Sequence, residues 1–462
     1  MTNKTKYILP AFFILIWVGI GLTACLPKQK PADQQEETSS RIQPEWLKDA
    51  VLYEVNIRQY TPEGTFDAFA EHLPRLKELG VDILWIMPIH PISEEKRKGS
   101  LGSYYAVQDY TGINPEFGTL DDFKELVNQA HDLGFKVIID WVANHTGWDN
   151  PWIYDHPEWF TTDSTGAIIS PDPDWTDIAD LNFDVPQMRR AMIDAMDYWL
   201  TETNIDGFRC DVAWGVPNDF WEEARTSFDS IKPVYMLAED EDHPELLEMA
   251  FESNYAWELH HIMNDVAKGE KTAADIRNYF EKIGGKYAEG SFPMQFITNH
   301  DENSWAGTVS ERMGDAADAF AVFSFTVPGI PLIYSGQEAG LDKRLAFFEK
   351  DEIDWSEMKK EDLYKNLIAL KTNNPALWNG EFGEDVRFLN NGHPDQLLAY
   401  VREKNDNAVL VIMNLSSQPV VDSVEFDVQH DFAAWKGKEK LIGGEKVNIE
   451  LQPWEYKIYT RK

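Results

Sequence analysis

Ile205-Asp206-Gly207-Phe208-Arg209-Cys210-Asp211 is a short, mostly apolar run that ends in a carboxylate and carries an arginine two residues earlier. Glu239 and Asp301 also follow short apolar runs, and residues 137–145 form a further run that ends in Asn-His. Strand ends that carry acids and histidines indicate a site assembled from several strands. Catalytic residues are distributed in this way on barrels of alternating strands and helices.

Apolar runs alternate with amphipathic stretches from about residue 50 to residue 370. Residues 66–79 place apolar side chains at helical spacing and precede Gly80, which predicts a helix with a C-terminal stop. Residues 81–87 are almost all apolar, which is typical of a parallel strand buried on both faces. The other predicted strands span residues 51–57, 137–142, 207–212, 234–237, 255–259, 296–298 and 331–334. Repeated units of this kind predict a parallel sheet, closed or open.

Two regions interrupt the alternation. Residues 146–187 are rich in Trp, Asp, Pro and Thr and are too long for a routine strand-to-helix loop, which predicts a small inserted subdomain. Residues 375–462 contain short runs of period two, which predict a separate antiparallel β domain. The predicted catalytic barrel therefore spans residues 45–374.

The first residues have the pattern of an export signal. Lys4 and Lys6 precede an apolar run over residues 7–22, which predicts a secretory signal peptide of residues 1–25. The sequence Leu22-Thr23-Ala24-Cys25 resembles the bacterial lipoprotein box, and this resemblance implies that cleavage leaves Cys25 as a lipidated N-terminus. The alternative is an uncleaved membrane anchor, for which the run is a little short.

Residues 26–44 are rich in Gln, Glu, Lys and Pro and predict a flexible linker. The protein is therefore expected to be exported and tethered to the cell envelope by lipid. Leu26 stands where some Gram-negative lipoproteins carry the Asp that retains them at the inner membrane. Its presence favours the outer membrane.

The composition of the chain excludes one class of partner. The net charge is −37 over 462 residues, whereas nucleic-acid binding needs Lys and Arg to neutralise phosphates. A neutral ligand such as a carbohydrate is compatible with this charge, which also serves solubility. If Cys25 carries lipid, Cys210 is unpaired, and it is expected to be a small buried strand residue. Nothing in the sequence specifies an oligomeric state.

Four motifs in order resemble glycoside hydrolase family 13, the α-amylase family. They are residues 140–145 (Asp, three residues, Asn, His), residues 207–211 (Gly-Phe-Arg-Cys-Asp), Glu239, and residues 296–301, which end in Asn-His-Asp. The resemblance covers nearly the whole chain after the linker. It implies an α/β fold: a (β/α)8 TIM barrel with a small inserted domain after the third strand and a C-terminal β-sandwich domain.

The resemblance also implies roles for the three carboxylates. Asp211 would be the nucleophile and Glu239 the general acid/base. Asp301 would hold the 2- and 3-hydroxyls of the sugar and favour its distorted ring.

Substrate-binding roles follow from the same motifs. Arg209 would pair with the Asp211 carboxylate, and His145 and His300 would bind sugar hydroxyls. A further segment resembles the family's first-subsite segment, with Tyr105 four residues before Asp109-Tyr110, and implies that Tyr105 stacks under the ring at the cleavage point. Most of the many tryptophans are expected to pack in the core. The candidates for lining the cleft are Trp141 and Trp214.

Retaining glycoside hydrolysis needs two carboxyl groups about 5–5.5 Å apart, one on each side of the bond. One must be ionised to attack the anomeric carbon, and the other must carry a proton for the leaving sugar. Arg209 and Asp211 are two residues apart on a strand, so both should project into the barrel. The guanidinium is expected to lower the pKa of Asp211.

One feature departs from the family pattern. Many members carry Lys-His shortly after the nucleophile, where the His carbonyl helps to hold calcium, but this chain reads Val212-Ala213-Trp214-Gly215-Val216. Asn144 matches a remaining calcium-ligand position, but one residue does not make an oxygen cage. No cofactor is therefore expected to be required. Calcium is possible but unsupported by the sequence, and calcium dependence is expected to be small.

The sequence favours an exported α-glucan hydrolase that cleaves α-1,4 bonds of starch-derived polymers or oligosaccharides. A first alternative keeps the site but transfers or isomerises glucosyl units, or prefers short or α-1,6-linked substrates. A second alternative is a non-catalytic glycan-binding lipoprotein. The presence of Asp211, Glu239 and Asp301 argues against the second alternative, because inactive members should lose triad residues.

Overall fold

The structure, a computed structural model, describes residues 43–425, 430–444 and 446–461. The predicted signal peptide, Cys25 and nearly all of the predicted linker lie outside the described residues. The described residues belong to a unit that spans Ser40–Lys462. In this part of the chain, none of the helices is long and apolar enough to cross a membrane.

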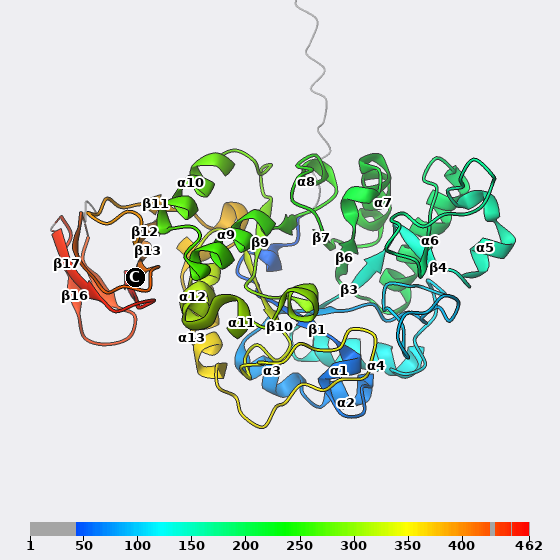
Figure 1. The fold of residues 1–462 in the computed structure, drawn as a ribbon, viewed down its shortest axis with the longest axis horizontal. Helices are drawn as coiled ribbons and strands as arrows, with labels where there is room; N and C mark the ends of the chain where they lie inside the picture. The colour runs from blue at the N-terminus through cyan, green and yellow to red at the C-terminus, as the bar shows by residue number, and fades with distance from the viewer. Residues whose placement is uncertain (1–42, 426–429, 445, 462) are drawn as a thin grey trace, which may run out of the picture. The chain divides into compact units, whose positions relative to one another are not determined.

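Eight parallel strands close into a barrel in the spatial order β1-β10-β9-β8-β7-β6-β3-β2, which confirms the predicted fold class (Figure 1). Strands that follow each other in this part of the chain lie side by side, as expected for repeated strand–helix units. The strands are β1 (Leu52–Val55), β2 (Ile83–Ile86), β3 (Lys136–Val142), β6 (Gly207–Asp211), β7 (Tyr235–Ala238), β8 (Ser253–Tyr255), β9 (Phe292–Gln295) and β10 (Ile330–Tyr334).

Helices cover the barrel, and each presents an apolar face to it. Helix α4 begins with a capping box in which Thr119 and Asp122 bond each other's backbone N–H groups, and its buried face carries Phe123, Leu126 and Val127. The helices of this region are α1 (Ile57–Tyr60), α2 (Phe66–Ala70), α3 (Leu73–Leu79), α4 (Leu120–Asp132), α6 (Pro186–Glu202), α7 (Asn218–Ile231), α8 (Leu246–Met249), α9 (Trp257–Lys268), α10 (Ala273–Ile283), α11 (Val309–Met313), α12 (Ala317–Thr326) and α13 (Glu361–Thr372).

Three predicted elements were wrong in their bounds. The predicted helix over residues 66–79 is two helices, because Pro74 fits the first turn of α3 but not the interior of one continuous helix. The predicted strand over residues 255–259 falls mostly in α9, since β8 ends at Tyr255. The predicted strand over residues 296–298 lies after β9, whose Pro293 weakens the local strand signal.

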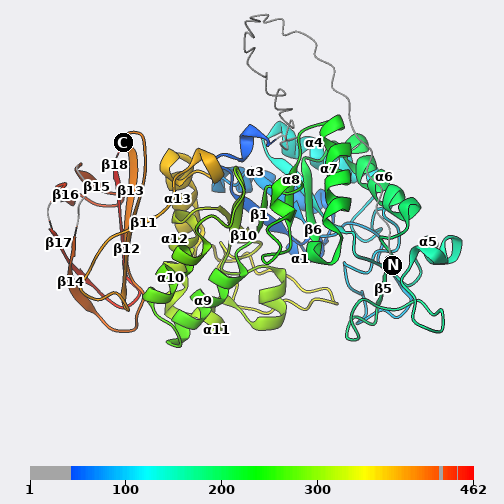
Figure 2. The same cartoon turned by 90° about the horizontal axis from the view of Figure 1, so that it is seen from above.

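The segment between β3 and α6 contains the predicted insertion. Its strands β4 (His145–Gly147) and β5 (Ile178–Asp180) pair antiparallel, and α5 (Pro151–Asp155) lies between them in the chain. Both views show this segment at the end of the described unit opposite to the C-terminal strands (Figures 1 and 2).

The C-terminal residues form two antiparallel sheets, with strand orders β11-β12-β13-β18-β15-β16 and β14-β17. Strand β17 alternates exposed and buried residues, and its Val447, Ile449 and Leu451 share a core with Leu410 and Ile412 of β13. The strands are β11 (Arg387–Phe388), β12 (Leu397–Lys404), β13 (Asn407–Asn414), β14 (Val420–Glu425), β15 (Phe432–Ala434), β16 (Lys440–Leu441), β17 (Lys446–Leu451) and β18 (Tyr456–Arg461). The predicted antiparallel β domain is therefore present.

Arg402 of β12 ties this sheet to the barrel. Its buried guanidinium donates to the backbone carbonyls of Glu384 (2.6 Å), Val327 (2.9 Å), Trp378 (3.2 Å) and Thr326 (3.3 Å). Two of these carbonyls lie at the end of α12, and the other two lie in the connection from α13 to the sheet. One side chain thus bonds backbone groups from two parts of the chain that are about 50 residues apart in sequence.

We expect Arg402→Met to lower the free energy of unfolding by at least about 2 kcal/mol, because it leaves several buried carbonyls without a donor. Urea denaturation measures the loss. Arg461→Met on β18 of the same sheet is the control, since its ion pair with the exposed Asp406 lies at the surface and is expected to contribute less than about 1 kcal/mol. Equal losses in the two variants would contradict the role assigned to Arg402.

Candidate active site

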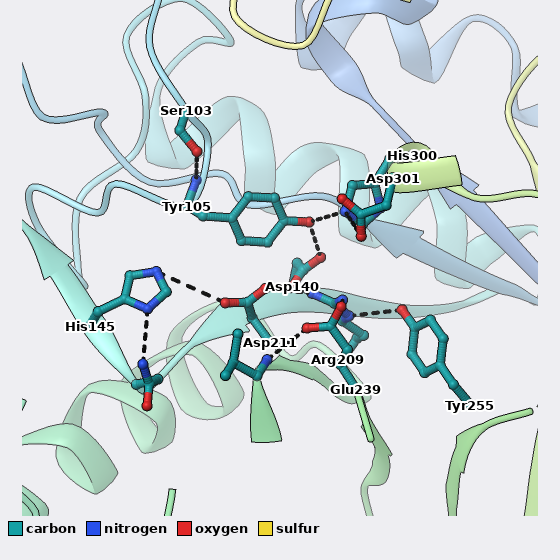
Figure 3. Close-up of polar contacts among 12 residues, drawn as sticks. Ser103, Tyr105, Asp140, His145, Arg209, Asp211, Glu239, Tyr255, His300 and Asp301 are labelled. Atoms are coloured by element: carbon teal, nitrogen blue, oxygen red, sulfur yellow. Dashed lines mark hydrogen bonds and ion pairs between the residues drawn. The ribbon is translucent and has the colours of Figure 1, made fainter. Parts of the chain in front are cut away.

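The three predicted carboxylates, Arg209, His145, His300 and Tyr105 lie together at the C-terminal end of the barrel strands (Figure 3). In the parallel register of β3 and β6, Asp140 lies beside Arg209, and Asp211 projects to the same side of β6 as Arg209. Glu239 follows β7 directly, and Asp301 lies in the connection after β9. The structure therefore brings together all three predicted catalytic carboxylates around one arginine.

Arg209 is fully buried and holds the site together. Its Nη1 lies 2.9 Å from Asp140 Oδ1 and 3.2 Å from Asp211 Oδ1, and its Nη2 lies 2.9 Å from Glu239 Oε1. Its Nε donates to the hydroxyl of Tyr255 at 3.1 Å. Burial lowers the pKa of Arg209, but Asp140 and Glu239 raise it well above its usual value, so the guanidinium stays charged.

The protonation of Asp211 differs from the sequence expectation. Burial and the nearby Glu239 raise the pKa of Asp211 well above its ordinary value, although Arg209 acts in the opposite direction. The prediction of a lowered pKa was therefore wrong as a net effect. Its physical reason is that burial of Asp211 and the nearby carboxylates outweigh the one guanidinium that these carboxylates share.

The turn after Asp211 is strained and contacts the second carboxylate. Val212 has a φ of +45°, which is unusual for a β-branched residue, and its N–H donates to Glu239 Oε2 at 2.7 Å. Glu239 is thus held from one side by Arg209 and from the other by a backbone N–H. Backbone strain of this kind concentrates at functional sites.

His300 forms a second charged centre. Its Nε2 lies 2.8 Å from the Tyr105 hydroxyl and 3.2 Å from Asp301 Oδ2, and its Nδ1 is bonded to Glu54. Burial lowers the pKa of His300, but Asp301 and Glu54 outweigh it and raise the value to about 9. His300 is therefore a cation at neutral pH, next to the carboxylate that the resemblance assigns to the sugar hydroxyls.

Sequence reasoning missed three residues of this site. Glu54 of β1 is fully buried against His300, Trp85 of β2 donates its Nε1–H to Asp140 Oδ2 at 3.1 Å, and Tyr255 of β8 contacts Arg209. An acid inside the apolar strand Leu52–Val55 was a usable signal for Glu54, because such an acid must find a partner. The tyrosine and the tryptophan carry no local signal of this kind.

His145 lies beside Asp211 as a neutral ring. Its Nε2 is 4.0 Å from Asp211 Oδ2, and burial lowers its pKa to about 3. Its Nδ1 contacts Asn144 Nδ2 at 3.3 Å. The structure thus places His145 where the resemblance expects it, and its binding of a sugar hydroxyl stays a prediction.

Asn144 is buried beside His145, and its role as a calcium ligand stays a prediction. Among residues 43–425, 430–444 and 446–461, no three His, Cys, Asp or Glu side chains cluster in a way that could hold a metal ion. Calcium needs six to eight oxygen ligands, which Asn144 alone does not supply.

The two tryptophans predicted to line the cleft differ in their exposure to solvent. Trp141 is fully buried and packs against Phe208 at 5.7 Å and Tyr110 at 5.3 Å, so this prediction was wrong. The reason is the strand alternation: Asp140 points into the barrel, and its neighbour must point to the helices. Trp214 is 56% exposed and follows Asp211 by three residues, so its role in the cleft stays a prediction.

Cys210 shows the same alternation on β6. Its side chain is fully buried in the core outside the barrel strands, and burial raises the pKa of its thiol well above the usual value. The prediction of a buried strand residue rather than a nucleophile is confirmed.

Comparisons with known proteins agree with this geometry. A family model described as the alpha amylase catalytic domain matches residues 32–381, and a maltogenic amylase C-terminal domain model matches residues 386–458. An α-amylase of Haloarcula japonica is 30% identical over 402 residues, which cover 81% of this chain and 57% of that protein.

Solved structures are similar over almost their entire length. A maltogenic α-amylase from Thermotoga neapolitana superposes with a TM-score of 0.82 at 29% identity, covering 90% of this chain and 99% of that chain. An α-amylase from Lactobacillus plantarum gives a TM-score of 0.80 at 29% identity, with the same coverage of 90% and 99%.

The barrel, the carboxylate site and these relatives together define a glycoside hydrolase of the α-glucan-hydrolysing class. Within that class, the chain belongs to the α-amylase family.

The Glu54–His300 contact predicts a pH dependence of stability. The pKa of His300 is about 9 in the fold and ordinarily 6.5, so its contribution is fully present below pH 6.5 and is lost as the pH rises through 9. Over that window it removes up to about 3 kcal/mol of unfolding free energy. Glu54→Gln takes away one of the two carboxylates that raise this pKa, so we expect a smaller loss in the variant.

Urea unfolding at pH 6.5 and pH 9 measures both losses. Glu78→Gln, at an exposed glutamate of α3, is the control and should lose as much as the parent protein. If Glu54→Gln and the parent protein lost the same amount, Glu54 would not be the partner that keeps His300 charged.

Proposed function

We propose that the protein is a retaining hydrolase that cleaves α-1,4-glucosidic bonds of starch-derived poly- and oligosaccharides through a covalent glycosyl-enzyme intermediate. The contact of Asp211 and Glu239 with the two terminal nitrogens of one guanidinium carries this proposal. Because both carboxyl groups contact one guanidinium, they lie close together. This supports the separation of about 5–5.5 Å that retaining enzymes need, rather than the wider separation of inverting enzymes.

In the first step, an oxygen of ionised Asp211 attacks the anomeric carbon and forms a covalent ester. The bond to the glycosidic oxygen breaks, and Glu239 gives its proton to that oxygen so that the shortened glucan leaves as an alcohol. In the second step, Glu239 takes a proton from water, which attacks the same carbon and releases Asp211. The first step leaves Glu239 ionised and Asp211 bound as an ester. The second step protonates Glu239 again and frees Asp211 as a carboxylate, so the starting state of the site is restored.

The neighbouring groups favour the transition state of both steps. Positive charge develops at the sugar ring, next to ionised Asp211 and to the carboxylate of Asp301. Arg209 keeps Asp211 oriented through its Nη1 contact at 3.2 Å. In the free site the pKa of Asp211 is raised, so the developing positive charge helps to hold this group ionised when it must attack.

Asp211→Asn is expected to lower hydrolysis of maltoheptaose by at least about 10⁴-fold, because an amide cannot form the ester. Reducing-sugar release measures the loss, and an unchanged melting temperature excludes unfolding. Proton NMR of the parent reaction should show the α-anomer first. Initial β-anomer would overturn the retaining mechanism, and rapid turnover by Asp211→Asn would overturn the nucleophile.

A transferase or isomerase of the same family would share this site. Chromatography of products from starch, maltoheptaose, pullulan and trehalose separates the outcomes. Hydrolysis of the first two to short maltooligosaccharides supports the proposal. Net formation of longer chains or interconversion of maltose and trehalose would favour the alternative.

We also propose that the protein is exported and anchored by lipid on Cys25, with the catalytic domain outside the cytoplasm. The support is the sequence alone: a basic start, an apolar run over residues 7–22, Leu22-Thr23-Ala24-Cys25, and a polar stretch over residues 26–44. The outer membrane is the proposed site in a Gram-negative cell, because Leu26 replaces the retention signal.

The anchor is tested by expressing the full chain and its Cys25→Ser variant in bacteria. We expect the parent protein to incorporate labelled fatty acid at Cys25. It should also partition into detergent, because the apolar surface of attached acyl chains favours a membrane-like phase over water. Cys25→Ser should incorporate none. Equal labelling of the two proteins, or a parent protein without label, would contradict the lipidation at Cys25.

A further inference from the structure

A buried arginine of α11 bonds the chain on both sides of Asp301. The Nη2 of Arg312 donates to the carbonyl of Ile297 at 2.8 Å, and its Nε donates to the carbonyl of Gly307 at 2.9 Å. These two carbonyls stand at the beginning and at the end of residues 297–307, which we call the Asp301 segment. One guanidinium thus fixes both ends of the segment that carries this carboxylate.

The same guanidinium contacts the side chain that follows Asp301. Its Nη1 lies 3.3 Å from Glu302 Oε2, and Nε2 of His260 on α9 lies 3.0 Å from the same oxygen. Burial raises the pKa of Glu302, but His260 and Arg312 outweigh it and lower the value, so the carboxylate stays ionised. The residue next to Asp301 is therefore held by charged contacts.

Two packed helices hold the guanidinium in place. Helices α9 and α11 contact each other and lie side by side in Figure 2. Arg312 Nη1 donates to Asn264 Oδ1 of α9 at 2.9 Å. The ring of His260 stacks on that of Phe296 at 4.5 Å, with an inclination of only 7°. The contacts to the Asp301 segment thus come from helices, which hold a side chain more precisely than loops do.

Hydrogen bonds inside the segment carry this support to Asp301. On one side, Asn299 Oδ1 accepts from the N–H of Glu302 at 2.8 Å. On the other side, the N–H of Gly307 donates to the carbonyl of Glu302 at 2.8 Å and closes the π-helical turn Glu302–Ala306. Asp301 lies between Asn299 and Glu302, so the bonds around it restrict its backbone.

Asp301 needs support from behind because its own side chain is partly open to solvent. The side chain is 35% exposed, and its Oδ2 lies 3.2 Å from His300 Nε2. A carboxylate that leaves a surface free for a ligand cannot be fixed by packing on every side, so its backbone must be held instead. A misplacement of about 1 Å can lower a rate about 100-fold.

We propose that Arg312 is a positioning residue for Asp301. By bonding both ends of the Asp301 segment, its guanidinium places the carboxylate where it binds the hydroxyls of the reacting sugar. The proposal rests on the proposed function and deepens it, because it gives a part in bond cleavage to a side chain that acts through another residue.

Arg312→Met should lower kcat for maltoheptaose about 100-fold and change KM less than about threefold, because hydrogen bonds to the sugar hydroxyls strengthen in the transition state. Arg312→Lys keeps a positive charge near Glu302, but an ammonium group lacks the planar fork that bonds two carbonyls at once. It should therefore show most of the same loss. Full activity of Arg312→Lys would overturn the two-sided bonding.

Arg225→Met is the matched control. Arg225 of α7 is also buried, and its Nη1 contacts Glu252 Oε1 at 2.7 Å and the carbonyl of Ala250 at 3.3 Å. Glu252 directly precedes β8, so this arginine lies at the N-terminal end of the barrel strands. Arg225→Met should lower the melting temperature, but kcat of the folded protein should stay within about twofold of the parent value. A fall of kcat equal to that of Arg312→Met would overturn the positioning role.

A substrate without one of the hydroxyls assigned to Asp301 tests the route of the effect. 4-Nitrophenyl α-maltoside is compared with its analogue that lacks the 2-hydroxyl on the ring bearing nitrophenol. Arg312→Met should lower kcat/KM about 100-fold for the maltoside but less than about tenfold for the analogue, because part of the supported interaction is already missing there. Equal losses on both substrates would overturn the proposal.

The parent protein separates this inference from the proposed function. If it neither releases nitrophenol from the maltoside nor forms reducing sugar from maltoheptaose, the proposed function fails and the inference fails with it. If it is active but Arg312→Met loses equally on both nitrophenyl substrates, only the positioning role fails. Should Arg312→Met not fold, Arg312→Lys is measured on the same pair of substrates, and the ratio of its two losses decides.

Discussion

The buried guanidinium of Arg209 is the interaction on which the rest of the site depends. A charge without access to water is stable only when several partners surround it. Here Asp140 from β3, Asp211 from the same strand β6, Glu239 after β7 and Tyr255 from β8 supply them. No single element can provide this set. A closed parallel barrel can, because the C-terminal ends of adjacent strands meet on one rim.

The same crowding sets the chemistry. The site holds five acidic side chains around two cations: Glu54, Asp140, Asp211, Glu239 and Asp301 around Arg209 and His300. Acids outnumber cations, so the site retains protons, and the pKa of Asp211 is raised although an arginine touches it. Retaining hydrolysis needs one proton held and one carboxylate free. With more acidic side chains than cations, the site can keep one carboxyl group protonated while another is ionised when the substrate binds.

The barrel strands and the loops contribute different side chains to this end of the barrel. The barrel strands and the residues directly after them carry Asp140, Arg209, Asp211 and Glu239. The loops after β9 and β10 carry Trp305, Phe347 and Phe348, and the ring of Phe347 lies between those of Trp305 and Tyr105.

The sequence by itself determined the alternation of strands and helices and the shared face of Arg209 and Asp211, because these follow from local periodicity. The closed barrel and the three candidate carboxylates followed from the resemblance of four ordered motifs to the family. The sequence also contained the alternation that places Trp141 outside the barrel, since Asp140 must point inward. Only the tertiary structure decided where β8 and β9 lie, because strands of three and four residues carry weak local signals. The contact of Glu54 with His300 joins residues 246 positions apart, and the pKa of Asp211 depends on burial by other strands. Both are products of barrel closure.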